Sequence, residues 1–334
     1  MSGTRALGRS GVRVSGLSLG GAGLGNLYAP VSDEDAARAV DAAWDAGIRY
    51  FDTAPHYGLG LSERRIGAAL RGRPRAAYAL STKVGRLLEP VAGPVAGDDL
   101  ADGGFAVPAA YRRVWDFSGD GVRRCLEASL TRLGVDRVDA VYLHDPDDHG
   151  EQAFREGYPA LEKLRAEGVV GAIGAGMNQT GMLTRFLRDT DVDAVLCAGR
   201  YTLLDQGALT ELLPVARARG AAVVIGGVFN SGLLADPRDG ARFDYRRAPR
   251  HLLDRARALR ALAERHGTTL RAAALAFPFG HPAVASVLVG IHAPGHVTDA
   301  ARQFASPVPA AFWREARASG LLPADVPVPG EEPA

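Results

Sequence analysis

Eight short apolar runs recur along the chain, and an amphipathic or polar stretch separates each run from the next. The runs span residues 17–21, 48–54, 78–84, 138–145, 170–176, 193–199, 221–227 and 284–290. Most are nearly continuous in Val, Ile, Leu and Ala, which is typical of parallel strands covered on both faces. The intervening helices are expected at 32–47, 62–72, 118–134, 158–168, 180–189, 208–220, 251–267 and 270–279, with Ser32 and Ser62 as N-caps. This alternation predicts an α/β fold, a closed (β/α)8 TIM barrel forming a single domain over residues 1–334.

Composition excludes several classes of function. A 47% hydrophobic chain of 334 residues can build a large core, and its net charge of +1 comes from scattered residues. We therefore expect neither a nucleic-acid nor a membrane partner. Cys125 and Cys197 lie in apolar periodic segments, and residues 1–11 lack a signal-like apolar core, so we expect a cytoplasmic protein. Histidines such as His266 and His281 form no metal-ligand grouping, so no metal is expected.

Two long loops and a tail stand out from the alternation. Residues 85–117 and 228–250 follow the third and seventh strands, so both should lie at the C-terminal mouth of the barrel, where active sites form. The tail, residues 306–334, holds six prolines and is expected to be irregular, either partly covering the mouth or disordered.

A glycine cluster, GGAGLG (20–25), allows a competing interpretation as a dinucleotide-binding Rossmann fold, with Asp52 as its ribose ligand. The cluster lacks the G-x-G-x-x-G spacing, and the next helix begins near Ser32, well past Gly25. The barrel is therefore favoured. Its glycines would let the first loop pass close to a ligand, or would simply make that loop flexible.

Four polar residues follow the C-terminal ends of neighbouring strands: Asp52, Tyr57, Lys83 and His144. A lysine cation beside a tyrosine favours the phenolate and should lower its pKa, while an aspartate holds the lysine charged and oriented. A histidine can donate a hydrogen bond to a substrate oxygen, so the set suits proton transfer at one carbon–oxygen group. Taken singly, each has a plainer explanation. Asp52 could cap a turn, and Tyr57 could be a packing aromatic. Lys83 could be a solvated strand end, and His144 could be a core histidine.

The stretches FDTAPHYGLGLSE (51–63), STKVGR (81–86) and VYLHDPD (141–147), in this order, resemble the aldo-keto reductase superfamily over about residues 12–305. The resemblance implies a nicotinamide cofactor extended across the mouth, with Asp52, Tyr57, Lys83 and His144 as catalytic residues. Tyr57 would be the general acid/base beside direct hydride transfer.

Further stretches are similar to the branch of D-threo-aldose 1-dehydrogenases, also called L-fucose dehydrogenases, with pyridoxal 4-dehydrogenase as a close relative. They are DFSGDGVRRCLEASLTRLG (116–134), YLHDPDDH (142–149), IGAGMNQ (173–179), AGRYTLLDQ (198–206) and GGVFNSGLLA (226–235). This likeness implies oxidation of an aldose at C1 to a lactone with NAD.

The resemblance also implies cofactor contacts, namely Gly21, Asp52, Asn178, Phe229, Asn230, Ser231, Gly232, Leu233, Gly290 and Asp299. Asn178 would bind the carboxamide, because the family's Ser-Asn pair after the fifth strand falls in the stretch GAGMNQ (174–179). The family's glutamine falls at Ala198, and its stacking tyrosine falls at Gly226. Phe229 would fill the space of that tyrosine, and backbone N–H groups of 230–233 would hold the pyrophosphate. Asp299 would bind adenosine hydroxyls and oppose a 2′-phosphate, which favours NAD over NADP unless His292 or His296 binds that phosphate.

Expected substrate contacts are His56, Tyr57, Arg86, Trp115 and His144, with Trp115 either stacking on a sugar or packing its loop. We expect a small-molecule sugar or aldehyde partner and a monomer or small homo-oligomer. A pyridoxal-type dehydrogenase, a general carbonyl reductase and a non-catalytic nicotinamide sensor are the competing functions.

Overall fold

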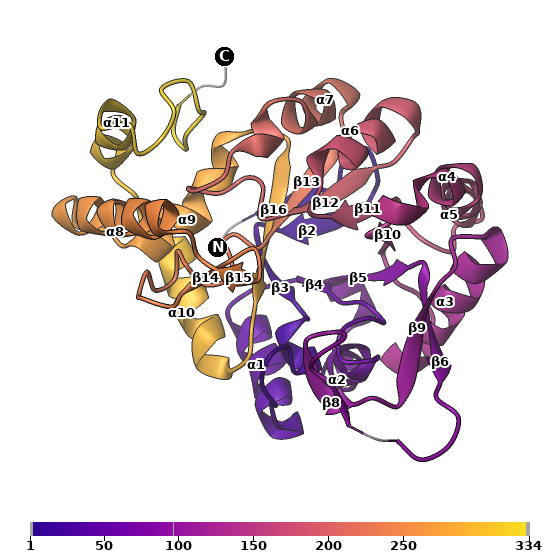
Figure 1. Cartoon of the computed structure of the whole chain (residues 1–334). Helices are drawn as coiled ribbons and strands as arrows, with labels where there is room; N and C mark the ends of the chain where they lie inside the picture. Colours follow the sequence, from indigo (N-terminus) through magenta and orange to yellow (C-terminus); the bar gives the residue numbers. More distant parts are fainter. Residues whose placement is uncertain (1–2, 96, 332–334) are drawn as a thin grey trace.

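The structure is a computed structural model that describes residues 3–95 and 97–331. Eight parallel strands form a closed barrel, each pairing with the next along the chain, and the last pairs with the first (Figure 1). They are β3 (Leu17–Gly20), β4 (Tyr50–Asp52), β5 (Ala79–Val84), β10 (Ala140–His144), β11 (Ala172–Met177), β12 (Ala194–Ala198), β13 (Ala222–Gly226) and β16 (Val284–Gly290). All eight expected strands are present, which confirms the (β/α)8 barrel.

Within the described residues, ten helices of seven or more residues surround the barrel (Figure 1). They are α1 (Asp33–Asp45), α2 (Leu61–Leu70), α3 (Gly119–Leu133), α5 (Tyr158–Ala166), α6 (Thr180–Asp189), α7 (Leu212–Arg219), α8 (Arg250–Arg265), α9 (Leu270–Ala276), α10 (Pro294–Ala305) and α11 (Ala310–Ala318). Shorter helical segments are η1 (Gly23–Gly25), η2 (Arg75–Ala77), η3 (Asp147–His149), α4 (Gly150–Gln152), η4 (Ala153–Gly157), η5 (Gly207–Leu209) and η6 (Phe277–Gly280).

Ser32 caps α1 as expected, since its side chain accepts from the Asp35 N–H. The expectation for Ser62 was wrong. Gly60, in the left-handed region, precedes α2, and Ser62 lies inside that helix. Its hydroxyl is hydrogen-bonded to the Thr53 hydroxyl and donates to the Gly21 carbonyl, so it ties α2 to the mouth loops instead of capping the helix.

An N-terminal hairpin closes the bottom of the barrel. Its strands are β1 (Thr4–Ala6) and β2 (Arg13–Ser15), and Leu7 and Val14 are fully buried within the barrel's inner core. Gly8 has a positive φ, and a Cβ there would lie 1.9 Å from the Asp193 carbonyl oxygen, so only glycine fits. With this end plugged by protein, ligands must enter at the opposite end.

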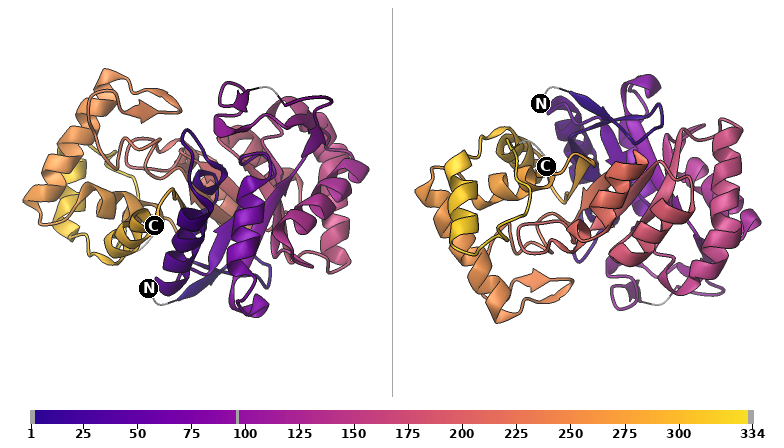
Figure 2. Two further views of the ribbon diagram at one scale, coloured as in Figure 1. Left: turned by 90° about the horizontal axis from the view of Figure 1, so that it is seen from below. Right: turned by 90° about the horizontal axis from the view of Figure 1, so that it is seen from above.

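Both long loops lie at that opposite end, away from the N-terminus (Figure 2). Residues 85–117 form two antiparallel ribbons, and 228–250 contain one small ribbon. The ribbon strands are β6 (Arg86–Pro90) with β9 (Tyr111–Trp115), β7 (Asp98–Asp99) with β8 (Phe105–Pro108), and β14 (Arg242–Phe243) with β15 (Arg246–Arg247). The expected position of both loops at the mouth is therefore confirmed. The strands within these loops were not expected.

The expectation of an irregular tail was wrong for residues 310–318, which form helix α11, while residues 306–309 and 319–331 hold only turns, bends and extended chain. Helix α11 begins after Pro309, a position where proline suits a helix start, and it packs against α8. Phe312 and Trp313 of this helix are buried. The segment after the helix then packs against Gly280, where an added Cβ would lie 2.5 Å from the Pro327 carbonyl oxygen. Because Gly280 precedes β16, this segment lies near the N-terminal ends of the strands and leaves the mouth uncovered. Residues 332–334 lie outside the described part.

Within residues 3–95 and 97–331, no helix is both long and apolar enough to cross a bilayer, and no group of three or more potential ligand side chains could hold a metal ion. Cys125 and Cys197 are buried free thiols.

Candidate active site

Two adjacent pockets open at the C-terminal end of the barrel. The larger pocket, of about 630 Å³, runs from the ends of β3 and β4 past the loop after β13 to α10. The smaller pocket, of about 400 Å³, lies beneath the 85–117 ribbons beside Tyr57. Residues lining both are Ala22, Leu27, Tyr28, Tyr57, Asn178, Leu196, Ala198 and Tyr245. A ligand in the larger pocket can therefore meet a second ligand in the smaller one.

The four expected polar residues converge at the junction of the pockets. Lys83 Nζ donates to Asp52 Oδ2 at 2.6 Å and to the Tyr57 hydroxyl at 3.1 Å. Ser81 Oγ donates to the other Asp52 oxygen at 2.7 Å. The His144 ring lies edge-on to the Tyr57 ring, with centroids 5.8 Å apart. Parallel register explains this convergence, because Gly20, Asp52 and Ser81 are paired neighbours at one end of the sheet.

Burial and neighbouring charges determine the pKa values of Lys83 and Tyr57. The Lys83 and Asp52 side chains are only 2% and 3% exposed. Burial alone would lower the pKa of Lys83, but Asp52 and Tyr57 more than offset it, so that pKa is raised and Lys83 stays charged. Burial raises the pKa of Tyr57 and outweighs the lowering by Lys83. The expectation of a net lowering was therefore wrong, because the sequence shows the cation but not the burial.

His144 is held neutral. Burial, together with the charges of Arg86 and Lys83, keeps its pKa well below the usual range. Its Nδ1 atom is buried without a hydrogen-bond partner among the described residues, and Nε2 lies 3.6 Å from Asp145 Oδ2. A neutral imidazole beside a tyrosine hydroxyl can donate one hydrogen bond to a substrate oxygen.

Arg86 and Trp115 lie beside the site, and neither is among the residues that line the smaller pocket. Arg86 forms an ion pair with Asp145, and its guanidinium lies 4.2 Å from the centre of the Trp115 ring. Trp115, 39% exposed, also packs against His149. Packing and charge compensation within the protein thus engage both side chains, and their expected substrate contacts stay a prediction. His56, by contrast, lines the smaller pocket.

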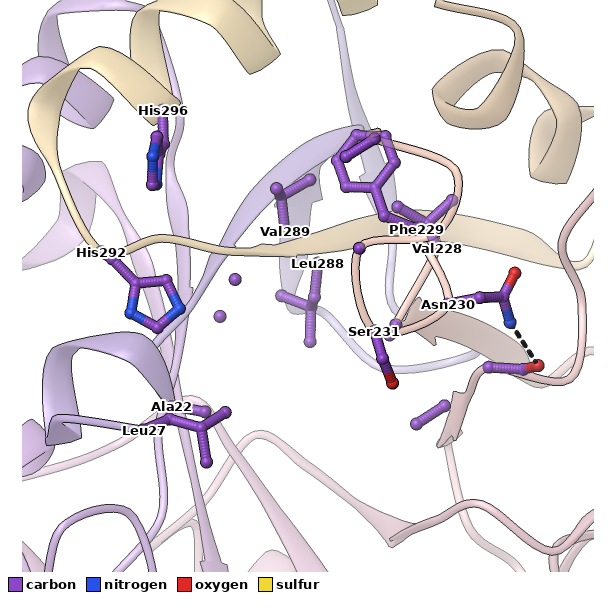
Figure 3. Close-up of a pocket in the computed structure, with 18 of the residues that line it drawn as sticks. Ala22, Leu27, Val228, Phe229, Asn230, Ser231, Leu288, Val289, His292 and His296 are labelled. Carbon is purple, nitrogen blue, oxygen red and sulfur yellow. Dashed lines mark hydrogen bonds between the residues drawn. The ribbon is translucent and has the colours of Figure 1, made fainter. Parts of the chain in front are cut away.

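The larger pocket is lined by most of the expected cofactor contacts: Gly21, Asp52, Asn178, Phe229, Asn230, Ser231, Gly232, Gly290 and Asp299. Figure 3 shows Asn230 and Ser231 on one side, His292 and His296 on the other, and Leu288 and Val289 between them. Asn230 donates to the Gly199 carbonyl, but its Oδ1 atom is buried without a partner among the described residues. That oxygen is free to accept from a ligand N–H or hydroxyl.

Two expectations in this loop were wrong. Leu233 is fully buried in the core and does not line the pocket. The N–H groups of Asn230, Gly232 and Leu233 already donate to carbonyls of Gly227, Phe229 and Asn230 within tight turns. These three N–H groups are therefore not available to a pyrophosphate.

The glycines of the first loop serve protein packing. A Cβ at Gly21 would lie 2.5 Å from Ser62 Oγ, at Gly23 2.1 Å from the Ile291 carbonyl oxygen, and at Gly25 2.6 Å from the Tyr57 carbonyl carbon. The mouth loops thus approach each other backbone to backbone, which fixes the loop that carries Tyr57.

Tyr245 and Arg271 are among the residues of the larger pocket that the sequence did not predict. Tyr245 stands at the tip of the β14–β15 hairpin, where Asp244 and Tyr245 both have positive φ; burial raises the pKa of its hydroxyl, and the nearby Asn178 side chain partly offsets that effect. Arg271 lines the pocket from α9 and lies 3.4 Å from Asp299, which Arg302 also contacts at 2.7 Å. The pair Asp244–Tyr245, which lies between β14 and β15, was the sequence signal that could have predicted this hairpin. Nothing in the sequence indicated Arg271.

The fold agrees with that of known proteins. The model of the Aldo/keto reductase family matches residues 16–319. The chain belongs to the aldo-keto reductase family. It is therefore an oxidoreductase of a family that uses nicotinamide cofactors. The larger pocket fits such a cofactor: it is extended, meets the smaller pocket at Tyr57, and offers the unpartnered Asn230 oxygen and the Asp299 carboxylate.

Among its relatives, D-threo-aldose 1-dehydrogenase of Pseudomonas sp. is 45% identical over 94% of this chain and 96% of that protein. Pyridoxal 4-dehydrogenase of Microbacterium luteolum is 42% identical over 95% and 97%. An aldo-keto reductase of Bacillus halodurans, in its holo form, superimposes with a TM-score of 0.75 at 27% identity over 97% of both chains.

Proposed function

We propose that this protein is an NAD-dependent dehydrogenase that oxidises an aldose at C1 to the lactone, with Tyr57 as general acid/base. The observation that carries the proposal is the Tyr57 hydroxyl 3.1 Å from a buried, Asp52-paired lysine, at the point where the two pockets meet. The 45% identity to an aldose 1-dehydrogenase supports the choice of substrate.

In this proposal Tyr57 accepts the proton of the C1 hydroxyl. Lys83 stabilises the phenolate that performs this step, because its cation is 3.1 Å from the phenol oxygen. Asp52 keeps Lys83 charged and aimed at Tyr57, and neutral His144 donates a hydrogen bond that holds the reacting oxygen. Bound NAD supplies the hydride acceptor.

The larger pocket favours NAD in two respects. Asp299 can accept from the hydroxyls of an adenosine ribose, as acids do in other NAD sites. Arg271, a basic residue on this wall, already contacts Asp299, so a 2′-phosphate would have to compete with that carboxylate. Asn178 would bind the carboxamide of the nicotinamide, and the ring of Tyr245, which lines the same pocket, would contact its face.

A pyridoxal-type dehydrogenase is the second candidate, favoured by the 42% identity to pyridoxal 4-dehydrogenase over nearly the whole chain. The apolar wall of Phe105 and Leu27 over the smaller pocket suits an aromatic ring as well as a sugar face. A non-catalytic nicotinamide sensor would not require the complete Asp52–Lys83–Tyr57 arrangement. The two buried thiols suit a reducing compartment, so we propose a cytoplasmic location.

A spectrophotometric screen tests this function. NAD and NADP, each in its oxidised and its reduced form, are offered with a panel of aldoses, pyridoxal and simple aldehydes, and the absorbance of the reduced cofactor is followed. NADH formation that depends on an aldose supports the proposal. Turnover with pyridoxal alone supports the second candidate, and reductive turnover with NADPH alone contradicts both.

A further inference from the structure

His56 lies directly before Tyr57 and forms part of the wall of the smaller pocket. Its ring centroid is 6.1 Å from that of Tyr57 and 5.6 Å from that of His144. Phe105 packs edge-on against it at 5.2 Å. His56 thus faces the space that a substrate would occupy, close to both groups that would hold the reacting oxygen.

Arg113 determines which nitrogen of His56 carries the proton. Its Nε atom lies 2.5 Å from His56 Nδ1. A guanidinium can only donate hydrogen bonds, so Nδ1 must present its lone pair, and the single proton of the neutral ring is on Nε2. Burial and the charges of Arg86 and Arg113 lower the pKa of His56 to about 2, so the ring does not gain a second proton near neutral pH.

Arg113 is itself held in place. Asp99 accepts from both terminal nitrogens of the guanidinium, at 2.7 and 2.5 Å. The pair is buried, with side chains 15% and 4% exposed. A Cβ at Gly103 would come within 2.2 Å of both partners, so glycine is required for the pair to close. A planar guanidinium clamped at two points leaves its Nε–H in one direction, towards His56.

We propose that Asp99 and Arg113 are positioning residues that fix His56 as an Nε2–H donor directed into the smaller pocket, where it binds a second substrate oxygen on the carbon next to the reacting one. His56 Nε2 has no hydrogen-bond partner among the described residues. This inference rests on the proposed function for its substrate, and for an aldose oxidised at C1 the second oxygen is the C2 hydroxyl.

The tautomer is measured directly, without substrate. Full-length protein labelled with ¹⁵N at histidine is examined by long-range ¹⁵N–¹H correlation, and the His56 signals are assigned by their loss in His56→Gln. We expect a pure Nε2–H tautomer that does not titrate between about pH 5 and 8. Arg113→Met should give a tautomer mixture, whereas Arg112→Met, on the exposed face of the same strand, should not. An Nδ1–H ring in the native protein, or an unchanged ring in Arg113→Met, would overturn the positioning role.

Kinetics test the second oxygen. We expect kcat/KM for an aldose to exceed that for its 2-deoxy analogue by about tenfold, the worth of one hydrogen bond to a fixed donor. His56→Leu and Arg113→Met should bring this ratio close to one, while His56→Gln, which offers an amide N–H, should retain part of it. Arg112→Met should keep the native ratio.

If Arg113→Met does not fold, Asp99→Asn is used in its place. This variant loosens the Arg113 guanidinium and keeps the shape of the side chain at position 99. Equal turnover of the two sugars by the native enzyme would contradict the contact with C2. If no aldose is turned over, the proposed function fails, and the NMR measurement still decides whether Arg113 fixes His56.

Discussion

The buried Lys83–Asp52 pair should contribute to stability and to catalysis in separable ways. Replacing Lys83 by Met leaves the Asp52 carboxylate, 3% exposed, with Ser81 Oγ as its remaining side-chain donor. Removing one partner of a buried pair costs about 3–5 kcal/mol of the free energy of unfolding, because the other charge stays buried and uncompensated. Replacing both charges, as in Lys83→Met with Asp52→Asn, should recover most of that loss.

The double variant should recover stability but not turnover. The Lys83 cation is what lowers the pKa of Tyr57 against the effect of burial. Without it the phenolate becomes harder to form, so both variants should lose about 100-fold or more in kcat. Urea unfolding followed by circular dichroism gives the stability, and NADH absorbance gives kcat.

Lys163→Met is the matched control, since Lys163 is the other lysine of the chain and is exposed on α5. It should leave stability and kcat nearly unchanged. A double variant that regains near-native kcat would refute the role of Lys83, and a single variant as stable as the native protein would refute the uncompensated-charge argument.

Three further results are expected. Because oxidation needs deprotonated Tyr57 and the pKa of Tyr57 is raised, the rate of sugar oxidation should increase from neutral to alkaline pH while the reverse reduction slows; a flat pH–rate profile would contradict this. Trp313→Ala should cost about 3–5 kcal/mol in urea unfolding, since Trp313 of the tail is buried against Phe277, and a loss below about 1 kcal/mol would argue against that packing. Asp299→Asn should shift the ratio of kcat/KM for NADP over NAD upwards by about fivefold, because it removes a charge worth about 1 kcal/mol and leaves Arg271 free for a 2′-phosphate; an unchanged ratio would place the adenosine elsewhere.

The barrel and the cluster of four polar residues could be predicted because both follow from local patterns. Apolar runs covered on both faces indicate parallel strands, and the C-terminal ends of parallel strands meet at one edge. Asp52 and His144 end such runs and Lys83 is the last residue but one of its run, so their convergence needs no knowledge of loop structure.

Other features depend on contacts between distant segments. Arg113 meets His56 across 57 positions, through a ribbon whose path the sequence does not reveal. The N–H of Leu233 is used by a turn within its own loop, which composition alone does not show. The prolines of the tail suggested irregular chain, yet Pro309 stands where a helix tolerates it and Phe312 supplies the apolar surface that anchors α11.

Tyr57→Phe tests the central claim most directly, because it removes one hydroxyl and keeps the ring that packs against His144 and Phe105. The measurement pairs kcat for the aldose found in the screen with NAD binding followed by quenching of intrinsic fluorescence. We expect turnover to fall to background while the Kd for NAD stays within about twofold, since the hydroxyl acts in proton transfer and not in holding the cofactor. A variant that keeps a near-native kcat would contradict the assignment of Tyr57 as the general acid/base.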